Sequence, residues 1–366
     1  MKQKRLFLKA GILAIVLVSA TVIAWEMYLR QQGRGVSYDD GGSLWADKRK
    51  QVYEPIDKAT VFIGSSRIKY DLDIPTWQKI TGDKAIQLAN VGSSALPILY
   101  DLADDPHFKG KLVFDVTEFL MFSNAPYVNY TPQQVLDYHK KETPAQKFSA
   151  AVNHVLESNF YLLDKEEYSL NALLGDLKFN DRPGVYAAPN FPPGFTPVTA
   201  DRQNYMTESL VRDPNQIKQV TDVWQMLGRI AASMPPVTEG AVDSVIASVK
   251  ASCDKIKARG GKVIFVRTPS SGPLRAMEKM AFPREKFWDK ILKVTGCEGI
   301  HFEDFDAIAH FECPEFSHLS VPQAVSFTKS LINILHEKGW KLPSSKNTTN
   351  NIASILIKSK PWYSIH

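Results

Sequence analysis

Five short apolar segments, separated by stretches with helical periodicity, constrain the fold of this 366-residue chain most. The segments cover residues 60–64, 85–91, 111–116, 262–267 and 299–302. Each is rich in β-branched or aromatic residues, as buried strands are. The clearest helical patterns cover residues 95–103, 239–259 and 321–338. Strands that alternate with helices predict an α/β fold with a parallel, doubly wound sheet.

One interval breaks this alternation. Residues 121–235 contain no convincing strand and combine proline-rich turns with further helical patterns. These patterns cover residues 132–141, 144–157 and 215–232. Because loops of this length are seldom structureless, we expect a mainly helical insertion over the C-terminal edge of the sheet, as a lid or a partner surface. It divides the domain into residues 57–120 and 236–340, and residues 341–366 are expected to form a peripheral tail.

The N-terminus combines basic residues with an uncharged apolar run. Residues 1–9 carry four positive charges and no acid, and residues 10–25 carry no charge. Extended to residues 10–29, the run reaches roughly 20 residues, about the span of a bilayer. It predicts a single-pass anchor with a cytoplasmic N-terminus, followed by a linker and lead-in over residues 30–56. A cleaved signal peptide is the alternative, and either reading places the body in the periplasm or outside the cell.

Charge and cysteine content argue against several functional classes. The net charge is +5, and the four basic residues at the N-terminus leave 5 − 4 = +1 for the rest, so nucleic-acid binding has little support. The spacing of Cys253, Cys297 and Cys313 fits no zinc site or redox pair, and no cofactor or metal is predicted. Either Cys297 and Cys313 form a disulfide, or all three cysteines are buried thiols.

Two polar motifs stand at predicted element boundaries. The stretch GSSR, residues 64–67, follows the first predicted strand, at the sheet edge where ligands bind. Gly64 permits a sharp turn, and a serine there needs a base to become a nucleophile. His318 follows Glu315 by three residues, just before the last predicted helix. This spacing lets the carboxylate accept from one imidazole nitrogen while the other faces the serine.

In their order and positions, these motifs resemble those of the SGNH, or GDSL-type, hydrolase superfamily. The resemblance implies a flavodoxin-like three-layer α/β/α sandwich. It also implies that Ser66 is the nucleophile, His318 the base, and Glu315 the orienting acid in place of the usual aspartate. Residues 90–94, NVGSS, match the turn where family members place an oxyanion-binding N–H. Backbone N–H groups of Ser66 and Gly92 are therefore the implied oxyanion donors.

The third family motif, a Gly-x-Asn turn after the third strand, is altered. Thr117 and Glu118 stand where the oxyanion-binding asparagine is expected, and Asn124 lies further on as a candidate substrate-binding residue. The loss of one oxyanion donor typically costs about 2.7–4 kcal/mol of transition-state stabilisation. A carboxylate would repel an oxyanion, so Glu118 either turns away or marks a different reaction.

Two arginines at strand ends are candidate substrate-binding residues. Arg67 follows Ser66, and Arg267 ends the fourth predicted strand. Their planar guanidinium groups suit a carboxylate or phosphate on a substrate. The alternative is that Arg67 pairs with Asp71 or Asp73 and Arg267 with Glu303. Aromatic residues of the insertion are similarly open to two readings, a glycan cleft or interior packing, and they are Tyr127, Tyr130, Tyr161 and Trp224.

The resemblance favours a membrane-tethered, extracytoplasmic serine esterase or O-acyltransferase that acts on acyl groups of a cell-envelope glycan or polymer. A membrane acyltransferase is then a candidate partner. The alternative from another class is a catalytically inactive binding or assembly subunit of an envelope polysaccharide-modification system. A phosphate cradle at residues 64–67 is a weaker reading, because it leaves Glu315 and His318 unexplained and no Walker-type lysine accompanies the serines.

Overall fold

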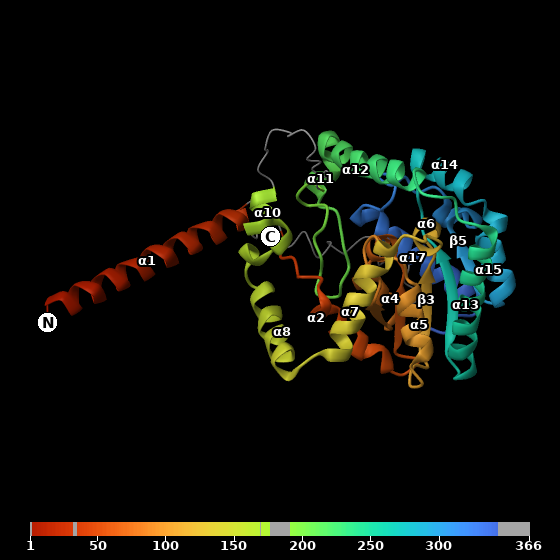
Figure 1. Ribbon diagram of the computed structural model, residues 1–366, viewed down its shortest axis with the longest axis horizontal. Helices are drawn as coiled ribbons and strands as arrows, with labels where there is room; N and C mark the ends of the chain where they lie inside the picture. The colour runs from red at the N-terminus through yellow and green to blue at the C-terminus, as the bar shows by residue number, and fades with distance from the viewer. Residues whose placement is uncertain (1, 32–34, 169, 176–190, 343–366) are drawn as a thin grey trace.

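The computed structural model describes residues 2–31, 35–168, 170–175 and 191–342 (Figure 1). At its centre is a five-stranded, all-parallel sheet with the strand order β2-β1-β3-β4-β5. The strands are β1 (Ala59–Ile63), β2 (Lys84–Gln87), β3 (Lys111–Asp115), β4 (Lys262–Arg267) and β5 (Glu298–His301). All five predicted strands and their parallel arrangement are confirmed. β2 is shorter than expected, because the chain turns at residues 90–94.

Helices cover both faces of the sheet, and alternate residues of each strand face opposite layers. Val61 and Ile63 belong to one hydrophobic cluster, and Phe62 belongs to the other. Helices of the first layer are α2 (Gly42–Lys50), α5 (Leu96–Asp104), α7 (Tyr130–Lys141), α13 (Glu239–Ala258) and α15 (Trp288–Thr295). Helices of the second layer are α3 (Ser66–Asp71), α4 (Ile74–Thr81), α16 (Asp306–Ala309) and α17 (Val321–Glu337). Because both faces are covered, the strands are apolar along almost their whole length.

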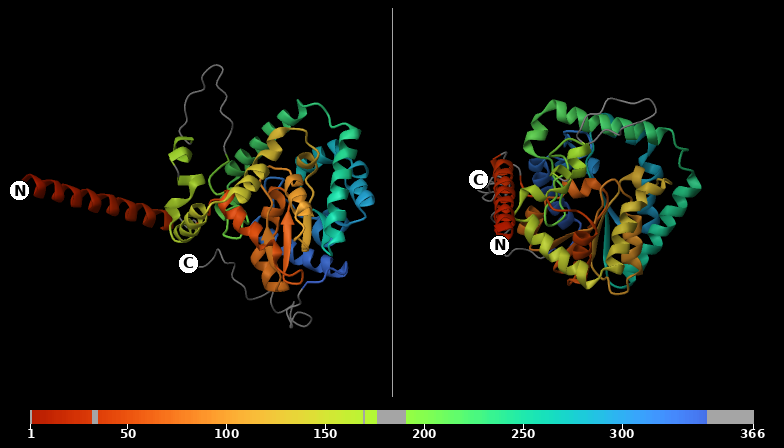
Figure 2. Two further views of the ribbon diagram at one scale, coloured as in Figure 1. Left: turned by 60° about the horizontal axis from the view of Figure 1, so that its bottom comes forward. Right: turned by 60° about the vertical axis from the view of Figure 1, so that its left-hand side comes forward.

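The helix α1 (Lys2–Gln31) projects away from the rest of the molecule (Figure 1 and Figure 2). In the described residues it is the one helix long and apolar enough to cross a membrane, and a signal anchor and a signal peptide both fit this description. The other helices are α6 (Glu118–Met121), α8 (Pro144–Glu157), α9 (Lys165–Tyr168), α10 (Leu170–Gly175), α11 (Glu208–Arg212), α12 (Pro214–Ala232) and α14 (Gly272–Ala281). Short 3₁₀ helices are η1 (Gln51–Tyr53), η2 (Pro126–Asn129), η3 (Tyr161–Leu163), η4 (Arg284–Lys286) and η5 (Phe302–Asp304).

The insertion is helical, but it does not lie only over the C-terminal edge of the sheet. The three helices expected within it are present as α7, α8 and α12, and the described residues between β3 and β4 include no sheet strand. α7 packs beside α2 in the first helix layer, because Val135 and Leu136 complete that hydrophobic cluster. α12 instead crosses the top of the molecule in Figure 1. Of the expected tail, residues 341–366, only residues 341 and 342 are among the described residues.

The lead-in segment is packed more tightly than a linker would be. Trp45 of α2 is fully buried and donates a hydrogen bond from Nε1 to the Leu88 carbonyl at 3.0 Å. Arg49 on the same helix pairs with Asp101, in the C-terminal half of α5, and with Asp105, the residue that follows α5. Residues 42–50 are therefore part of the folded domain.

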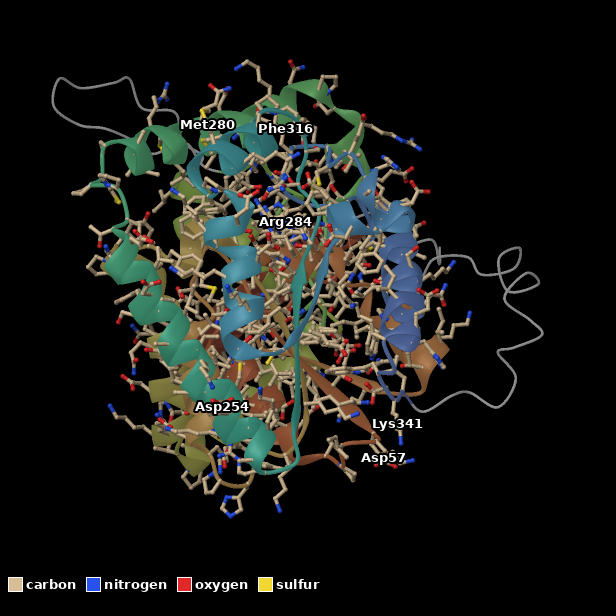
Figure 3. All side chains as sticks on the ribbon, turned by 90° about the vertical axis from the view of Figure 1, so that its right-hand side faces the viewer. Asp57, Asp254, Met280, Arg284, Phe316 and Lys341 are labelled. Carbon is tan, nitrogen blue, oxygen red and sulfur yellow. The ribbon has the colours of Figure 1, made fainter. Side chains whose placement is uncertain are left out.

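The amino ends and the carboxyl ends of the strands lie at opposite ends of the molecule. Figure 3 shows Met280 and Phe316 at one end and Asp57 and Lys341 at the other. Asp57 lies just before β1, so its end of the molecule holds the amino ends of the strands. The opposite end holds their carboxyl ends, where loops from several strands converge.

Candidate active site

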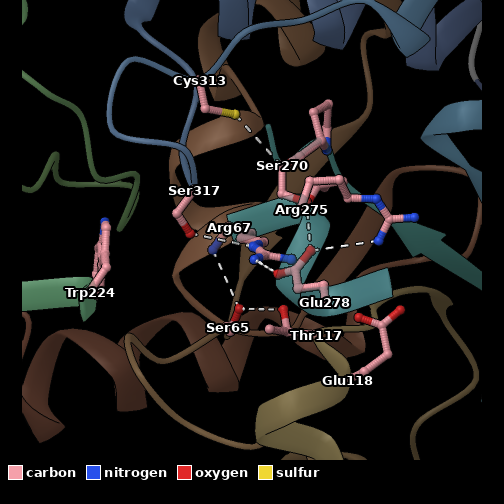
Figure 4. Close-up of polar contacts among 12 residues, drawn as sticks. Ser65, Arg67, Thr117, Glu118, Trp224, Ser270, Arg275, Glu278, Cys313 and Ser317 are labelled. Carbon is pink, nitrogen blue, oxygen red and sulfur yellow. Dashed lines mark hydrogen bonds and ion pairs between the residues drawn. The ribbon is translucent and has the colours of Figure 1, made fainter. Parts of the chain in front are cut away.

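The serine-containing turn lies where the strand order reverses. β1 pairs with β2 on one side and with β3 on the other, and this switch point is where open α/β sheets form ligand-binding crevices. Ser65 caps α3, and its Oγ lies 2.7 Å from Oγ1 of Thr117, which follows β3 (Figure 4). A side chain at position 64 would not fit, because a Cβ on Gly64 would lie 2.7 Å from Cβ of Asp115. Ser66, the residue after Ser65, is half-buried.

A chain of hydrogen bonds joins the serine, the histidine and the glutamate named from the sequence. Ser66 Oγ lies 2.8 Å from Nε2 of His318, and Nδ1 of His318 lies 2.8 Å from Oε1 of Glu315. When Nδ1 donates to the carboxylate, Nε2 is left to accept the serine proton. His318 and Glu315 are buried, with 1% and 0% exposure, so the half-buried serine is the exposed end of the chain. This is the geometry of an activated nucleophile.

Glu315 accepts two further hydrogen bonds. The backbone N–H of His318 donates to Oε1 at 2.6 Å, and Nε1 of Trp224 donates to Oε2 at 2.5 Å. Together with His318 Nδ1, these three donors compensate for the burial of the carboxylate. Trp224 lies on α12 of the insertion, 91 positions before Glu315. The sequence carried no signal for this pair, since no local spacing relates the two residues.

Aromatic rings enclose the imidazole of His318. The ring centroid of Tyr70 lies 4.3 Å from it, that of Trp224 5.8 Å and that of Phe195 5.9 Å. Tyr70 lies one helical turn after Ser66, and its hydroxyl donates to the Phe195 carbonyl at 2.8 Å. Burial, and then the charge of Glu315, raise the pKa of Tyr70 well above its usual range, so the ring stays neutral. The insertion thus supplies two of the three rings around this imidazole.

The loop that holds Gly92 is fixed beside the serine turn. The backbone N–H of Asn90 donates to the Gly64 carbonyl at 3.4 Å. Arg202, from the insertion, donates to Oδ1 of Asn90 at 3.3 Å and to the Gln87 carbonyl at 2.9 Å. Gly92 is exposed at φ +60°, a left-handed conformation that suits glycine.

Two backbone amides at this edge are available as donors. Ser66 occupies the first turn of α3, where N–H groups have no partner inside the helix. Within the described part of the chain, neither the Ser66 nor the Gly92 N–H donates to another protein group. These are the two amides that the family resemblance implied.

Glu118 turns away from the serine. Both of its carboxylate oxygens accept from Nε of Arg267, at 3.1 and 3.0 Å. The pairing holds the negative charge in an ion pair, so repulsion of an oxyanion by a free carboxylate does not arise. Thr117 and Glu118 thus provide no asparagine side chain as a hydrogen-bond donor, but the carboxylate of Glu118 is not left unpaired.

Both candidate substrate-binding arginines are used inside the protein. Glu278 of α14 accepts from Arg67 (Figure 4) and, at 2.5 Å, from Nη2 of Arg267. The two guanidinium groups are 1% and 0% exposed, which leaves no room for the predicted contact with a substrate. The predicted alternative pairings were also wrong, since Glu303 pairs with Arg275 instead. Burial alone would raise the pKa of Glu278, but Arg267 and Arg67 lower it to about 2.

Asp71 is hydrogen-bonded to the backbone of the loop that carries His318. Its Oδ1 accepts from the backbone N–H of Leu319, the residue after His318, at 2.9 Å. Burial raises the pKa of Asp71 well above its usual range, because an apolar environment disfavours the charged carboxylate. The pairing of Asp71 with Arg67 expected from the sequence does not form as a direct hydrogen bond.

The remaining candidates lie apart from the hydrogen-bonded chain. Asn124 is exposed after α6 and, within the described part of the chain, forms no hydrogen bond with Ser66 or His318. The three cysteines are all buried and free, so the disulfide alternative is not the one observed. Among the described residues there is no cluster of His, Cys, Asp and Glu that could hold a metal ion.

Neither the comparison with models of known protein families nor the search of curated proteins returned a match for this chain.

Proposed function

We propose that this protein is an SGNH-type serine esterase or O-acyltransferase, anchored in a membrane by α1, that acts on acyl groups of a cell-envelope glycan or polymer. The observation that carries the proposal is the buried hydrogen-bonded chain from Ser66 through His318 to Glu315. The strand order 2-1-3-4-5, which is the flavodoxin-like order, supports the SGNH-type assignment because the serine lies at its switch point.

In the proposed reaction, Ser66 Oγ attacks the acyl carbonyl carbon while Nε2 of His318 takes the hydroxyl proton. Glu315 stabilises the imidazolium, and the N–H groups of Ser66 and Gly92 donate to the tetrahedral oxyanion. When the ester C–O bond breaks, the leaving alcohol takes the proton from His318 and an acyl-serine remains. Water or a sugar hydroxyl then attacks this acyl-serine, with His318 again as the base. Water gives hydrolysis, and a sugar gives transfer.

The proposed oxyanion hole has two donors, because Glu118 and its partner Arg267 occupy the place of the usual asparagine. A missing donor typically costs about 2.7–4 kcal/mol of transition-state stabilisation. We therefore expect a slower reaction than a three-donor site would give, and an acyl acceptor held close by would compensate in part.

The anchor part of the proposal rests on α1. Four basic residues precede the apolar run of this helix, and Trp25 and Tyr28 lie near the other end. Basic residues favour the cytoplasmic side, and aromatic rings favour membrane interfaces. The proposed orientation is single-pass, with a cytoplasmic N-terminus and the catalytic domain in the periplasm. Confinement to a membrane would hold the enzyme near a membrane acyltransferase and nascent polymers.

Covalent labelling of the full chain in detergent with a fluorophosphonate probe tests the nucleophile. We expect a mass increase of one adduct for the wild type, and none for Ser66→Ala or His318→Ala. The matched control is Ser65→Ala, which removes a neighbouring hydroxyl and a helix cap worth about 1 kcal/mol but leaves the nucleophile intact. Ser65→Ala is expected to label.

A different result would favour the non-catalytic alternative. If the wild type, shown to be folded by its circular dichroism, takes up no probe, Ser66 is not activated and the chain is a binding or assembly subunit. If Ser65→Ala abolishes labelling and Ser66→Ala does not, the nucleophile has been assigned to the wrong serine.

A further inference from the structure

The helix α8 is unusually poorly covered for its length. Of its 14 residues, Glu157 alone is buried. Phe148, Val152 and Val155 are 74%, 41% and 60% exposed. Their spacing of four and three residues places all three on one face of the helix. Helices of this length are marginal in water unless an apolar face is covered, so the exposed stripe needs a partner.

The stripe points away from the rest of the protein. At 3.6 residues per turn, Glu157 lies on the side of the helix opposite Phe148 and Val152. Glu157 is buried, and His154 packs its ring 5.2 Å from that of Tyr38, so this other side faces the body. α8 is therefore amphipathic in the reverse sense to a core helix, because its polar side packs on the protein and its apolar side faces outward.

The end of α1 is fixed next to α8. Glu26, near the C-terminal end of α1, accepts hydrogen bonds from the backbone N–H groups of Tyr161 and Leu162 in η3, at 3.1 and 3.0 Å. Arg30 pairs with Glu26 and places its guanidinium 4.8 Å from the ring centroid of Tyr161. Because η3 follows α8 after three residues, the point where α1 meets the protein body lies beside α8, and Figure 1 shows α8 running across the direction of α1.

We infer that the outward face of α8 lies in the surface of the same bilayer that α1 crosses. The inference rests on the anchor reading of α1 given under the proposed function. If α1 spans the bilayer, its C-terminal end marks the membrane surface, and a helix lying across that direction at the same end lies along the surface. Interfacial helices bury their apolar face by about 5–10 Å at the boundary between headgroups and acyl chains.

Neighbouring residues suit this location. Phe160, in the turn after α8, and Leu173 and Leu174, on α10 beside the end of α1 (Figure 1), are also exposed apolar residues, at 42%, 47% and 50%. Lys141 and Lys147 are exposed at the end of α7 and on α8, where they can attract anionic lipid headgroups. Two contacts with the bilayer, rather than one helix, would restrict rotation of the domain and hold the serine crevice at one height above the membrane.

The test uses the full chain reconstituted in anionic phospholipid vesicles, with single cysteines carrying an environment-sensitive fluorophore. The native cysteines are buried, so introduced surface thiols are labelled selectively. Phe148→Cys and Val152→Cys are the test positions, and each leaves the rest of the stripe in place. Asn153→Cys, exposed on the polar flank of the same helix, and Met280→Cys, 79% exposed on the distant α14, are the controls.

We expect blue-shifted emission and quenching by lipid-borne nitroxides at Phe148 and Val152, and quenching by aqueous iodide at Asn153 and Met280. Equal iodide quenching at all four positions would overturn the inference. Protection of the Phe148 label from iodide that disappears when the protein is diluted with more lipid would also overturn it. In that case a second copy of the protein, and not the bilayer, would cover the apolar face of α8. A label at Ile15→Cys in α1 distinguishes failure of the α8 inference from failure of the anchor on which it rests. Lipid contact at Ile15 without contact at Phe148 refutes this inference alone, whereas water contact at Ile15 refutes the anchor as well.

Discussion

Removal of the charge of Glu278 tests whether the buried ion network stabilises the edge of the sheet that holds the candidate site. In the variant Glu278→Gln, Arg67 and Arg267 lose the carboxylate that they share, while the side-chain volume is nearly unchanged. Arg267 keeps Glu118, but Arg67 keeps only a long hydrogen bond from Nε to Ser317 Oγ at 3.5 Å. A buried guanidinium is then left without a direct counter-ion.

Two independent estimates give the size of the effect. Removal of one partner of a buried ion pair typically costs about 3–5 kcal/mol. The pKa of Glu278 is lowered from 4.5 to about 2, and at about 1.36 kcal/mol for each pKa unit this corresponds to about 3 kcal/mol. Because Glu278 is 2% exposed, solvent screening does not reduce this figure much. We expect Glu278→Gln to lower the free energy of unfolding by about 3 kcal/mol at pH 7.

The assay is urea unfolding of the full chain in detergent, followed by tryptophan fluorescence. Trp77 and Trp288 are buried on opposite faces of the sheet and report on both layers. The midpoint should fall by the lost free energy divided by the slope m, with m unchanged. Glu312→Gln, at an exposed carboxylate, is the control and should leave the midpoint where it is.

The pH dependence gives a second check. A carboxyl group with a lowered pKa contributes stability that is fully present above the unfolded pKa of about 4.5 and is lost as the pH falls toward about 2. The difference between the wild type and Glu278→Gln should therefore be constant above about pH 5 and shrink below about pH 4. A midpoint that shifts no more than that of Glu312→Gln, or a difference that does not change with pH, would refute the reasoning.

Three further variants test other contacts. Trp224→Phe keeps a ring but removes the donor to Glu315; a hydrogen bond to a charged group contributes about 1.5–3 kcal/mol to stability, so the unfolding free energy from the urea titration should fall by about that amount. Because Glu315 then holds His318 less firmly, the rate of fluorophosphonate labelling of the folded variant should fall as well. Gly64→Ala places a Cβ 2.7 Å from Cβ of Asp115, and such overpacking should lower the unfolding free energy by about 1–3 kcal/mol, measured by the same urea titration. Asp71→Asn cannot ionise; because the pKa of Asp71 is raised by burial, the wild type loses stability as the pH rises above about 4, and the midpoint of the variant relative to the wild type should be higher at pH 8 than at pH 5.

The sheet could be predicted from the sequence because each strand carries a local signal. β4 and α8 were predicted with the bounds that the structure gives them, since Gly260, Pro144 and the apolar pattern define their ends. The proximity of Glu315 and His318 was also predictable, because three positions in one turn fix it. The meeting of His318 with Ser66 was expected from the family resemblance and from the convergence of loops at one sheet edge.

The contacts that support the site could not be predicted in this way. Trp224 and Glu315, or Arg202 and Asn90, are far apart in the sequence and share no spacing or motif. The arginines were misread for a similar reason. Arg67 lies in the first turn of α3 and Arg267 at the end of β4, but Glu278 lies in an ordinary helical sequence and nothing there marks it as the shared partner of both.

The hydrogen bond between Ser66 and His318 joins residues 252 positions apart, and this separation affects the chain while it is being made. The N-terminal part of a protein emerges first during synthesis. The serine turn is thus complete long before its base, and a serine without a base is a weak nucleophile. Unfinished or truncated chains that end before residue 318 would carry an ordinary alcohol at position 66. In the proposed enzyme, the ability to cleave esters would appear only when the chain is essentially full length, so incomplete products would be chemically harmless.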